Sequence, residues 1–147
     1  MAAVQKFDRT MIEKFMQSHQ LRYLVDSDGN YILEIDYTEK MGCAIKNFLS
    51  IDGVNKDVYR IISVSDRRIA KGEWGKAVLL CNTWNMERLY QKAYLRIRDN
   101  DTFGTIVLEN SLDLEQGIHQ ELLDDFTMIT LSGAIVFWEW THKDRGF

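Results

Sequence analysis

The apolar residues of one stretch, residues 74–98, change their spacing partway along, and this change restricts the possible folds more than any other feature of the sequence. In the second half, residues 93–97 alternate between apolar and other side chains, as in a β-strand. In the first half, apolar residues recur as on one face of a helix, at Trp74, Ala77, Val78, Cys81 and Trp84. We therefore expect a helix followed directly by a strand, in a domain that mixes both kinds of element.

The chain before this stretch predicts a short helix and four strands. Thr10 and Glu13 are spaced as in a capping box, which indicates a helix over residues 10–19. Four runs rich in strand-forming residues follow, separated by turns, at residues 21–25, 31–37, 43–51 and 58–64. The last run has apolar side chains on both faces, which predicts a central place in the sheet.

The chain after this stretch predicts strands over residues 92–98 and 105–109, an acidic connection and a long final helix. Gly117 is the candidate cap of that helix. The predicted order is helix, four strands, helix, two strands and long helix, in a single domain over residues 1–147. This order predicts an α+β fold in which an antiparallel sheet is flanked by helices.

Residues around the change of spacing also resemble a known family. They are Cys81-Asn82-Thr83-Trp84-Asn85-Met86-Glu87-Arg88, followed by Lys92-Ala93-Tyr94-Leu95. The same elements occur in the same order in the YbjN family of bacterial sensory-transduction regulators, and the resemblance is sharpest over residues 77–126. The chain differs at residues 89–91, where many members have an aromatic residue followed by proline. The resemblance implies a type III secretion chaperone-like fold and a regulatory or chaperone-like protein-binding role.

The sequence also indicates the cellular compartment of the protein. Cys43 and Cys81 are the only cysteines, and each lies in an apolar segment, which favours buried free thiols over a disulfide. Charged residues interrupt residues 1–15, so we expect no secretory signal. The longest apolar stretch, residues 126–140, is too short to span a bilayer. We therefore expect a cytoplasmic protein without a membrane contact.

The charged residues are distributed unevenly along the chain. Residues 66–98 contain eight Lys or Arg and three Asp or Glu, whereas residues 99–126 contain eight Asp or Glu and no Lys or Arg. We interpret both segments as solvated faces that attract each other within the fold or across a dimer. The alternative for the first segment is an anion-binding patch.

The sequence lacks a recognisable catalytic arrangement. His19, His119 and His142 lie at a predicted helix end, a predicted helix start and the tail of the chain, and residues 72–76 lack the spacing of a phosphate-binding loop. We therefore expect no enzyme activity and no cofactor. The alternative is a small metal-dependent or small-molecule enzyme that uses the acidic region from Asp113 to His119. Glu115 and His119 are four residues apart and could bind a metal together with Asp113 or Glu121.

Two surfaces are candidates for binding a protein partner. The final helix has apolar residues on several sides, more than one sheet can cover, which predicts a homodimer or partner contact. The candidate residues on this helix are Phe137, Trp138 and Trp140. The basic connection before the central helix supplies Arg67, Arg68, Lys71 and Trp74. Single-stranded nucleic acid could bind such residues, but the isoelectric point near 5.4 argues against it.

Overall fold

The structure, a computed structural model, describes residues 3–147 and contains a seven-stranded antiparallel sheet. β1, β2, β3, β4 and β7 lie in this order, and β7 also pairs with β6 and, at its start, with β5. The strands are β1 (Leu24–Val25), β2 (Tyr31–Thr38), β3 (Cys43–Asp52), β4 (Val58–Ser65), β5 (Ile69–Ala70), β6 (Lys92–Arg96) and β7 (Phe103–Asp113). The predicted α+β fold is confirmed, and β4 is central as expected.

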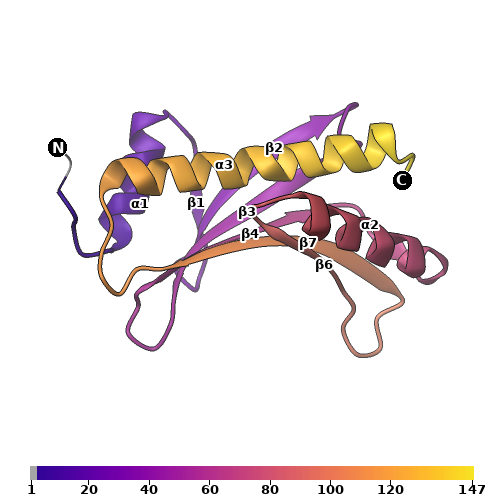
Figure 1. Ribbon diagram of the computed structural model, residues 1–147, viewed down its shortest axis with the longest axis horizontal. Helices are drawn as coiled ribbons and strands as arrows, with labels where there is room; N and C mark the ends of the chain where they lie inside the picture. Colours follow the sequence, from indigo (N-terminus) through magenta and orange to yellow (C-terminus); the bar gives the residue numbers. More distant parts are fainter. Residues whose placement is uncertain (1–2) are drawn as a thin grey trace.

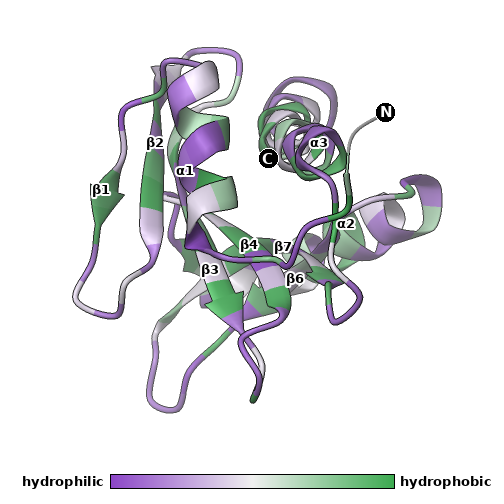
Figure 2. Ribbon diagram, turned by 90° about the vertical axis from the view of Figure 1, so that its left-hand side faces the viewer, coloured by the Kyte–Doolittle hydropathy of each residue, from purple (hydrophilic) through white to green (hydrophobic). Residues whose placement is uncertain are grey.

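All three helices lie on the same side of the sheet (Figure 1). They are α1 (Arg9–Ser18), α2 (Trp74–Glu87) and α3 (Gln120–Glu139). A 3₁₀ turn, η1 (Lys71–Glu73), precedes α2, and a π-helical turn, η2 (Trp140–Asp144), follows α3. Viewed along the long helix, α1, α3 and α2 form a row over the sheet (Figure 2). The opposite face of the sheet is therefore left without a helix, and we call it the open face.

The strand register assigns alternate residues to the two faces, because successive side chains of a strand point to opposite sides. One cross-strand row on the helix-covered face contains Leu33, Asn47, Ser63, Leu108 and Ala93. The next row lies on the open face and contains Glu34, Lys46, Val64, Val107 and Tyr94.

The buried residues form two hydrophobic clusters with a polar seam between them. One cluster packs α1 on the sheet around Phe15 and Tyr59, and the other packs α2 and the end of α3 around Trp84 and Phe137. In the seam the Ser63 hydroxyl donates to the Asn47 side chain, which donates to Leu33 O at 3.2 Å, and Asn110 Nδ2 donates to Thr130 Oγ1 at 3.0 Å. α3 crosses the seam and joins both clusters.

The predicted change from helix to strand is confirmed, and Asn85 explains its sharpness. α2 ends at Glu87 and β6 begins at Lys92. Asn85 accepts from Ala93 N at 2.8 Å and donates to Ala93 O at 3.0 Å, so one side chain joins the helix end to the strand. Trp84 is buried as expected, and its indole donates to Gln91 O at 3.1 Å.

Several predicted boundaries are wrong for identifiable reasons. Asp8, and not Thr10, caps α1, because its carboxylate accepts from Thr10 N at 2.9 Å. β1 is only two residues long, whereas β7 extends to Asp113 because β4 pairs with it along that length. Gly117 does not cap α3. It has φ +83° in a tight turn, where a Cβ would lie 2.5 Å from Gln5 O, and His119 caps the helix.

The residues that face the sheet from α3 include two threonines. Each satisfies its hydroxyl within the helix, since Thr127 donates to Leu123 O at 2.7 Å and Thr130 to Phe126 O at 2.8 Å. Both cysteines are free and buried, as expected. Within residues 3–147 no helix has the length and hydrophobicity that a bilayer crossing needs.

Candidate protein-interaction surface

The open face has an apolar centre that none of the helices within residues 3–147 covers. Phe48 and Ile62 lie opposite each other on β3 and β4, and Ile32 extends the same row onto β2. Val64 and Val107 form the next row. Phe48, Ile62 and Val64 keep part of their surface in contact with solvent. Aliphatic and aromatic side chains on an uncovered sheet face are typical of a surface that binds another molecule.

A hollow of about 550 Å³ lies on this face and extends across the strands. Its apolar lining includes Phe48, Ile62 and Val64. The hollow reaches from β2 to the end of β6, so its two ends are formed by strands on opposite sides of β4.

The charges around the hollow differ between its two ends. Glu34 and Asp36 line it at β2, whereas Arg96 and Arg98 line it at β6. Asp66, just after β4, also lines it. Lys46 reaches Glu34 only at 4.0 Å, and both side chains are more than half exposed. Among residues 3–147, neither arginine has a carboxylate within ion-pair distance, so both guanidinium groups are free to pair with a ligand.

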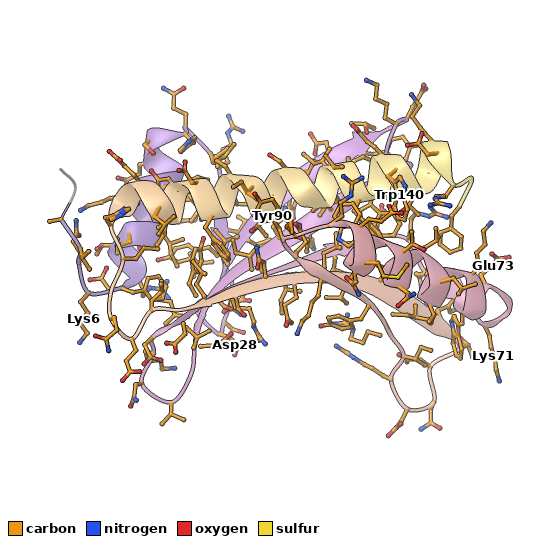
Figure 3. All side chains as sticks on the ribbon, in the orientation of Figure 1. Lys6, Asp28, Lys71, Glu73, Tyr90 and Trp140 are labelled. Carbon is orange, nitrogen blue, oxygen red and sulfur yellow. The ribbon has the colours of Figure 1, made fainter. Side chains whose placement is uncertain are left out.

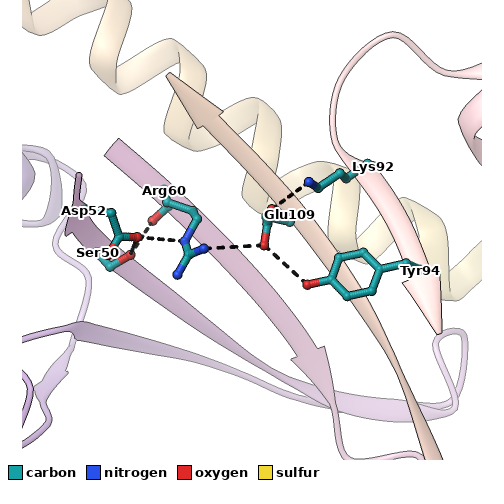
Figure 4. A network of polar contacts seen from close by, with 6 residues as sticks. All are labelled: Ser50, Asp52, Arg60, Lys92, Tyr94 and Glu109. Carbon is teal, nitrogen blue, oxygen red and sulfur yellow. Dashed lines mark hydrogen bonds and ion pairs between the residues drawn. The ribbon is translucent and has the colours of Figure 1, made fainter. Parts of the chain in front are cut away.

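A polar network occupies the open face beside the hollow (Figure 4). Glu109 is its centre, with Lys92 Nζ at 2.9 Å, the Tyr94 hydroxyl at 3.3 Å and an Arg60 guanidinium nitrogen at 3.9 Å. Arg60 Nε also lies 2.7 Å from Asp52, although its N–H is not aimed at that oxygen. Burial, followed by the charge of Glu109, raises the pKa of Tyr94. The charges of this network compensate one another, whereas Arg96 and Arg98 have no such partner among residues 3–147.

The structure places the predicted aromatic residues of the last helix mostly inside the protein. Phe137 and Trp138 are 0% exposed, so neither can contact a partner while the monomer is folded. Their rings pack against each other, and Phe137 and Trp140 pack against Trp84. Trp140 alone of the three keeps some exposed surface. Helix α2 covers the apolar sides of α3 that the sheet does not reach. The spacing of residues in the sequence does not reveal this second covering element.

The basic connection is brought against aromatic rings of the same chain. Arg67 lies over Trp138 and Phe147, with 5.6 and 5.1 Å from its guanidinium carbon to the ring centres, and it also donates to Phe147 O. Arg68 lies 4.3 Å over Phe103. Both arginines, which the sequence predicts to bind a partner, thus form cation–π contacts within the protein itself.

The other two predicted residues of the connection lie at the start of α2. Lys71 is exposed and well separated from Trp140 (Figure 3). The Trp74 indole donates to Ile69 O at 2.9 Å, which ties the helix start to β5. The structure thus joins Arg67 to Trp138 but does not gather all seven predicted residues into one surface.

The acidic region proposed for a metal has ordinary structural contacts. Asp113 accepts from Glu115 N at 3.1 Å, and His119 accepts from Leu122 N at 3.4 Å at the start of α3. In the part of the chain that the structure describes, no three His, Cys, Asp or Glu side chains are grouped to hold a metal ion.

A second apolar region lies between the end of α2 and the outer side of α3. A hollow of about 410 Å³ there is lined by Leu89, Tyr90, Ile129 and Val136, all of them exposed. The floor is closed by Gln91, whose amide donates to Thr130 O at 2.8 Å and occupies the space that a side chain at Gly133 would need.

The open face was not predicted as a site, although the sequence contained a signal for it. Apolar residues on both faces of β4 predict a central strand, and by themselves they do not indicate a binding surface. A central strand beneath helices on one side still has a second face, and Ile62 and Val64 lie on it. Side-chain alternation therefore identifies these residues once the helices are known to share one side.

The fold belongs to the type III secretion chaperone-like class. The model of the YbjN family, described as "Putative bacterial sensory transduction regulator", matches residues 8–141, and the protein therefore belongs to this family. No curated protein matches the sequence.

Two solved structures are similar in fold. One is "Crystal structure of YbjN, a putative transcription regulator from E. coli", with TM-score 0.78 and 10% sequence identity over 97% of this chain and 96% of that chain. The other is "Structure of the HopA1-SchA Chaperone-Effector Complex", with TM-score 0.55 and 16% identity over 89% and 91% of the two chains. At these identities the similarity shows the fold alone.

Proposed function

We propose that this protein is a non-enzymatic regulatory or chaperone-like module that acts in the cytoplasm by binding a protein partner on the open face of its sheet. The observation that carries the proposal is the apolar floor of Phe48, Ile62 and Val64, which lies between an acidic and a basic end. Apolar area supplies affinity, and charges at the rim select the partner and its orientation.

The charges of the open face and the two buried cysteines favour binding over catalysis. The charges beside the floor, on Arg60, Lys92, Asp52 and Glu109, are two positive and two negative and lie in contact with one another. Burial raises the pKa of Cys43 to about 12 and that of Cys81 to about 11, which keeps both thiols protonated and poorly nucleophilic near neutral pH. Buried reduced thiols also support the cytoplasmic assignment.

The comparisons support the same class of function. The family description names a regulator, and one neighbour in fold comes from a chaperone–effector complex. Both are consistent with a domain whose role is to hold another protein.

Affinity capture from the protein's own cells tests the proposal. The wild type is compared with Ile62→Glu, which places a charge on the floor, and with Val54→Glu, which places the same charge on a fully exposed loop residue. A partner that acts through the open face is retained by the wild type and the control but lost by Ile62→Glu. Equal retention by all three would contradict the proposal.

The homodimer stays a prediction. Because Phe137 and Trp138 are buried, we propose that its contact is formed by Trp140 and the apolar region between α2 and α3. Sedimentation equilibrium at tens of micromolar tests it. A dimer that Leu89→Glu disrupts supports this contact, whereas a strict monomer contradicts it.

A further inference from the structure

We infer that the occupant of the open face is an amphipathic helix of the partner, about 13 residues long, with basic residues at its N-terminal end and acidic residues at its C-terminal end. The inference rests on the proposed function and names the partner's structure and charge pattern. Its N-terminus lies over Glu34 and Asp36, and its C-terminus over Arg96 and Arg98.

The geometry of the face favours a helix over an extended segment. The backbone groups of β3, β4 and β7 are already paired with neighbouring strands, so the face offers no free ladder of N–H and C=O groups. An extended peptide lying there would bury unpaired backbone groups, which is costly. A helix satisfies its own backbone and can place an apolar stripe on Phe48, Ile62 and Val64.

The strand order sets the length of the helix. β2 and β6 are separated by β3, β4 and β7, so four strand spacings lie between the acidic and the basic end. At about 4.8 Å per spacing, this distance is about 19 Å. A helix rises about 1.5 Å per residue, so about 13 residues span the hollow.

The charges set the direction of the helix. Carboxylates stabilise the positive end of a helix dipole and guanidinium groups stabilise its negative end, so the N-terminus belongs over Glu34 and Asp36. The same carboxylates select basic side chains in the first turn, and Arg96 and Arg98 select acidic side chains in the last turn. This order is the reverse of the charge pattern that favours an isolated helix, so it is a specific signature of the partner.

Two synthetic 13-residue peptides of identical composition test the inference. Both have the same apolar stripe and the same side-chain staple on the opposite face, so that equal helicity of the free peptides can be verified by circular dichroism. One has lysines in the first turn and glutamates in the last turn, and the other has these charges exchanged. Fluorescence anisotropy measures the affinity of each for the whole protein.

At low salt the affinity of the lysine-first peptide is expected to be at least about tenfold higher than that of the peptide with exchanged charges. Added salt should reduce this difference in affinity. In the variant Arg96→Glu/Arg98→Glu the preference should disappear or reverse, whereas Lys71→Glu, at an exposed residue that does not line the hollow, should leave it unchanged. Ile62→Glu should weaken both peptides, since it disrupts the shared apolar contact.

Equal affinities, a preference for the exchanged peptide, or binding of neither peptide would overturn the inference. A dimer that Ile62→Glu dissociates would also overturn it, because a second copy would then occupy the face. Cellular capture separates these failures from failure of the proposed function. If Ile62→Glu still loses its partner while neither peptide binds, the open face binds proteins but not through this helix.

Discussion

Ile61 and Ile62 are neighbours in β4 that face opposite sides of the sheet, and truncating each to alanine tests the distinction between the covered and the open face. Ile61 is 0% exposed beneath the helices, and Ile62 faces the hollow and is partly exposed. Ile61→Ala is expected to cost about 2–5 kcal/mol of unfolding free energy, because it leaves a cavity in the core. Ile62→Ala is expected to cost about 1 kcal/mol, because it removes a side chain that is only partly buried.

Urea unfolding followed by tryptophan fluorescence measures both losses. The two variants are matched controls, since the same atoms are removed from adjacent positions of one strand and the change in strand propensity largely cancels. A domain of this size has a stability of about 5–15 kcal/mol, so the difference is easily resolved. Equal losses, or a larger loss for Ile62→Ala, would refute the assignment of an open face.

Three further predictions concern stability. Asn85→Ala removes two hydrogen bonds that join α2 to β6 and is expected to cost about 1–3 kcal/mol in urea unfolding, whereas Asn85→Asp, which keeps the acceptor, should cost less. Tyr59→Phe removes the buried contact at 2.8 Å to Thr127 and should cost about 1 kcal/mol, as a thermal melt beside the wild type would show; an unchanged melting temperature would contradict this. Burial raises the pKa of Cys43 to about 12 and of Cys81 to about 11, compared with 9.0 for an exposed thiol. The two protonated thiols therefore contribute fully to the free energy of unfolding below pH 9.0. This contribution is lost as the pH rises toward 11 and 12, because the thiols of the unfolded chain ionise first. Urea unfolding from pH 8 to 11 should show a steeper loss in the wild type than in a Cys43→Ala/Cys81→Ala variant, and parallel curves would contradict this.

The helix-to-strand change was predictable because local spacing alone encodes it. The apolar residues from Trp74 to Trp84 form a helical face whatever packs on them, and Ala93 and Leu95 form a strand face in the same way. Asn85 then fixes the junction through its two bonds to Ala93. Neither step needs knowledge of distant parts of the chain.

The interaction surface was not predictable in the same way, because spacing says which residues share a face and not what covers it. Phe137 and Trp138 have the composition of a docking site, yet α2 and the sheet bury them completely. Arg67 resembles a free basic group in the sequence, yet it packs on Trp138. The spacing of residues 58–64 does not show that Ile62 is uncovered, because this depends on all three helices lying on one side of the sheet. Long-range packing decides each of these cases.

The central claim is that the open face binds a protein partner, and photocrosslinking in the protein's own cells tests it most directly. Benzoylphenylalanine is introduced in place of Ile62 on the open face, or in place of Val54 or Leu79, which are exposed on a loop and on α2. The account predicts a crosslinked product of discrete mass from position 62 and none from the two control positions. Products from position 79 with none from position 62 would contradict it.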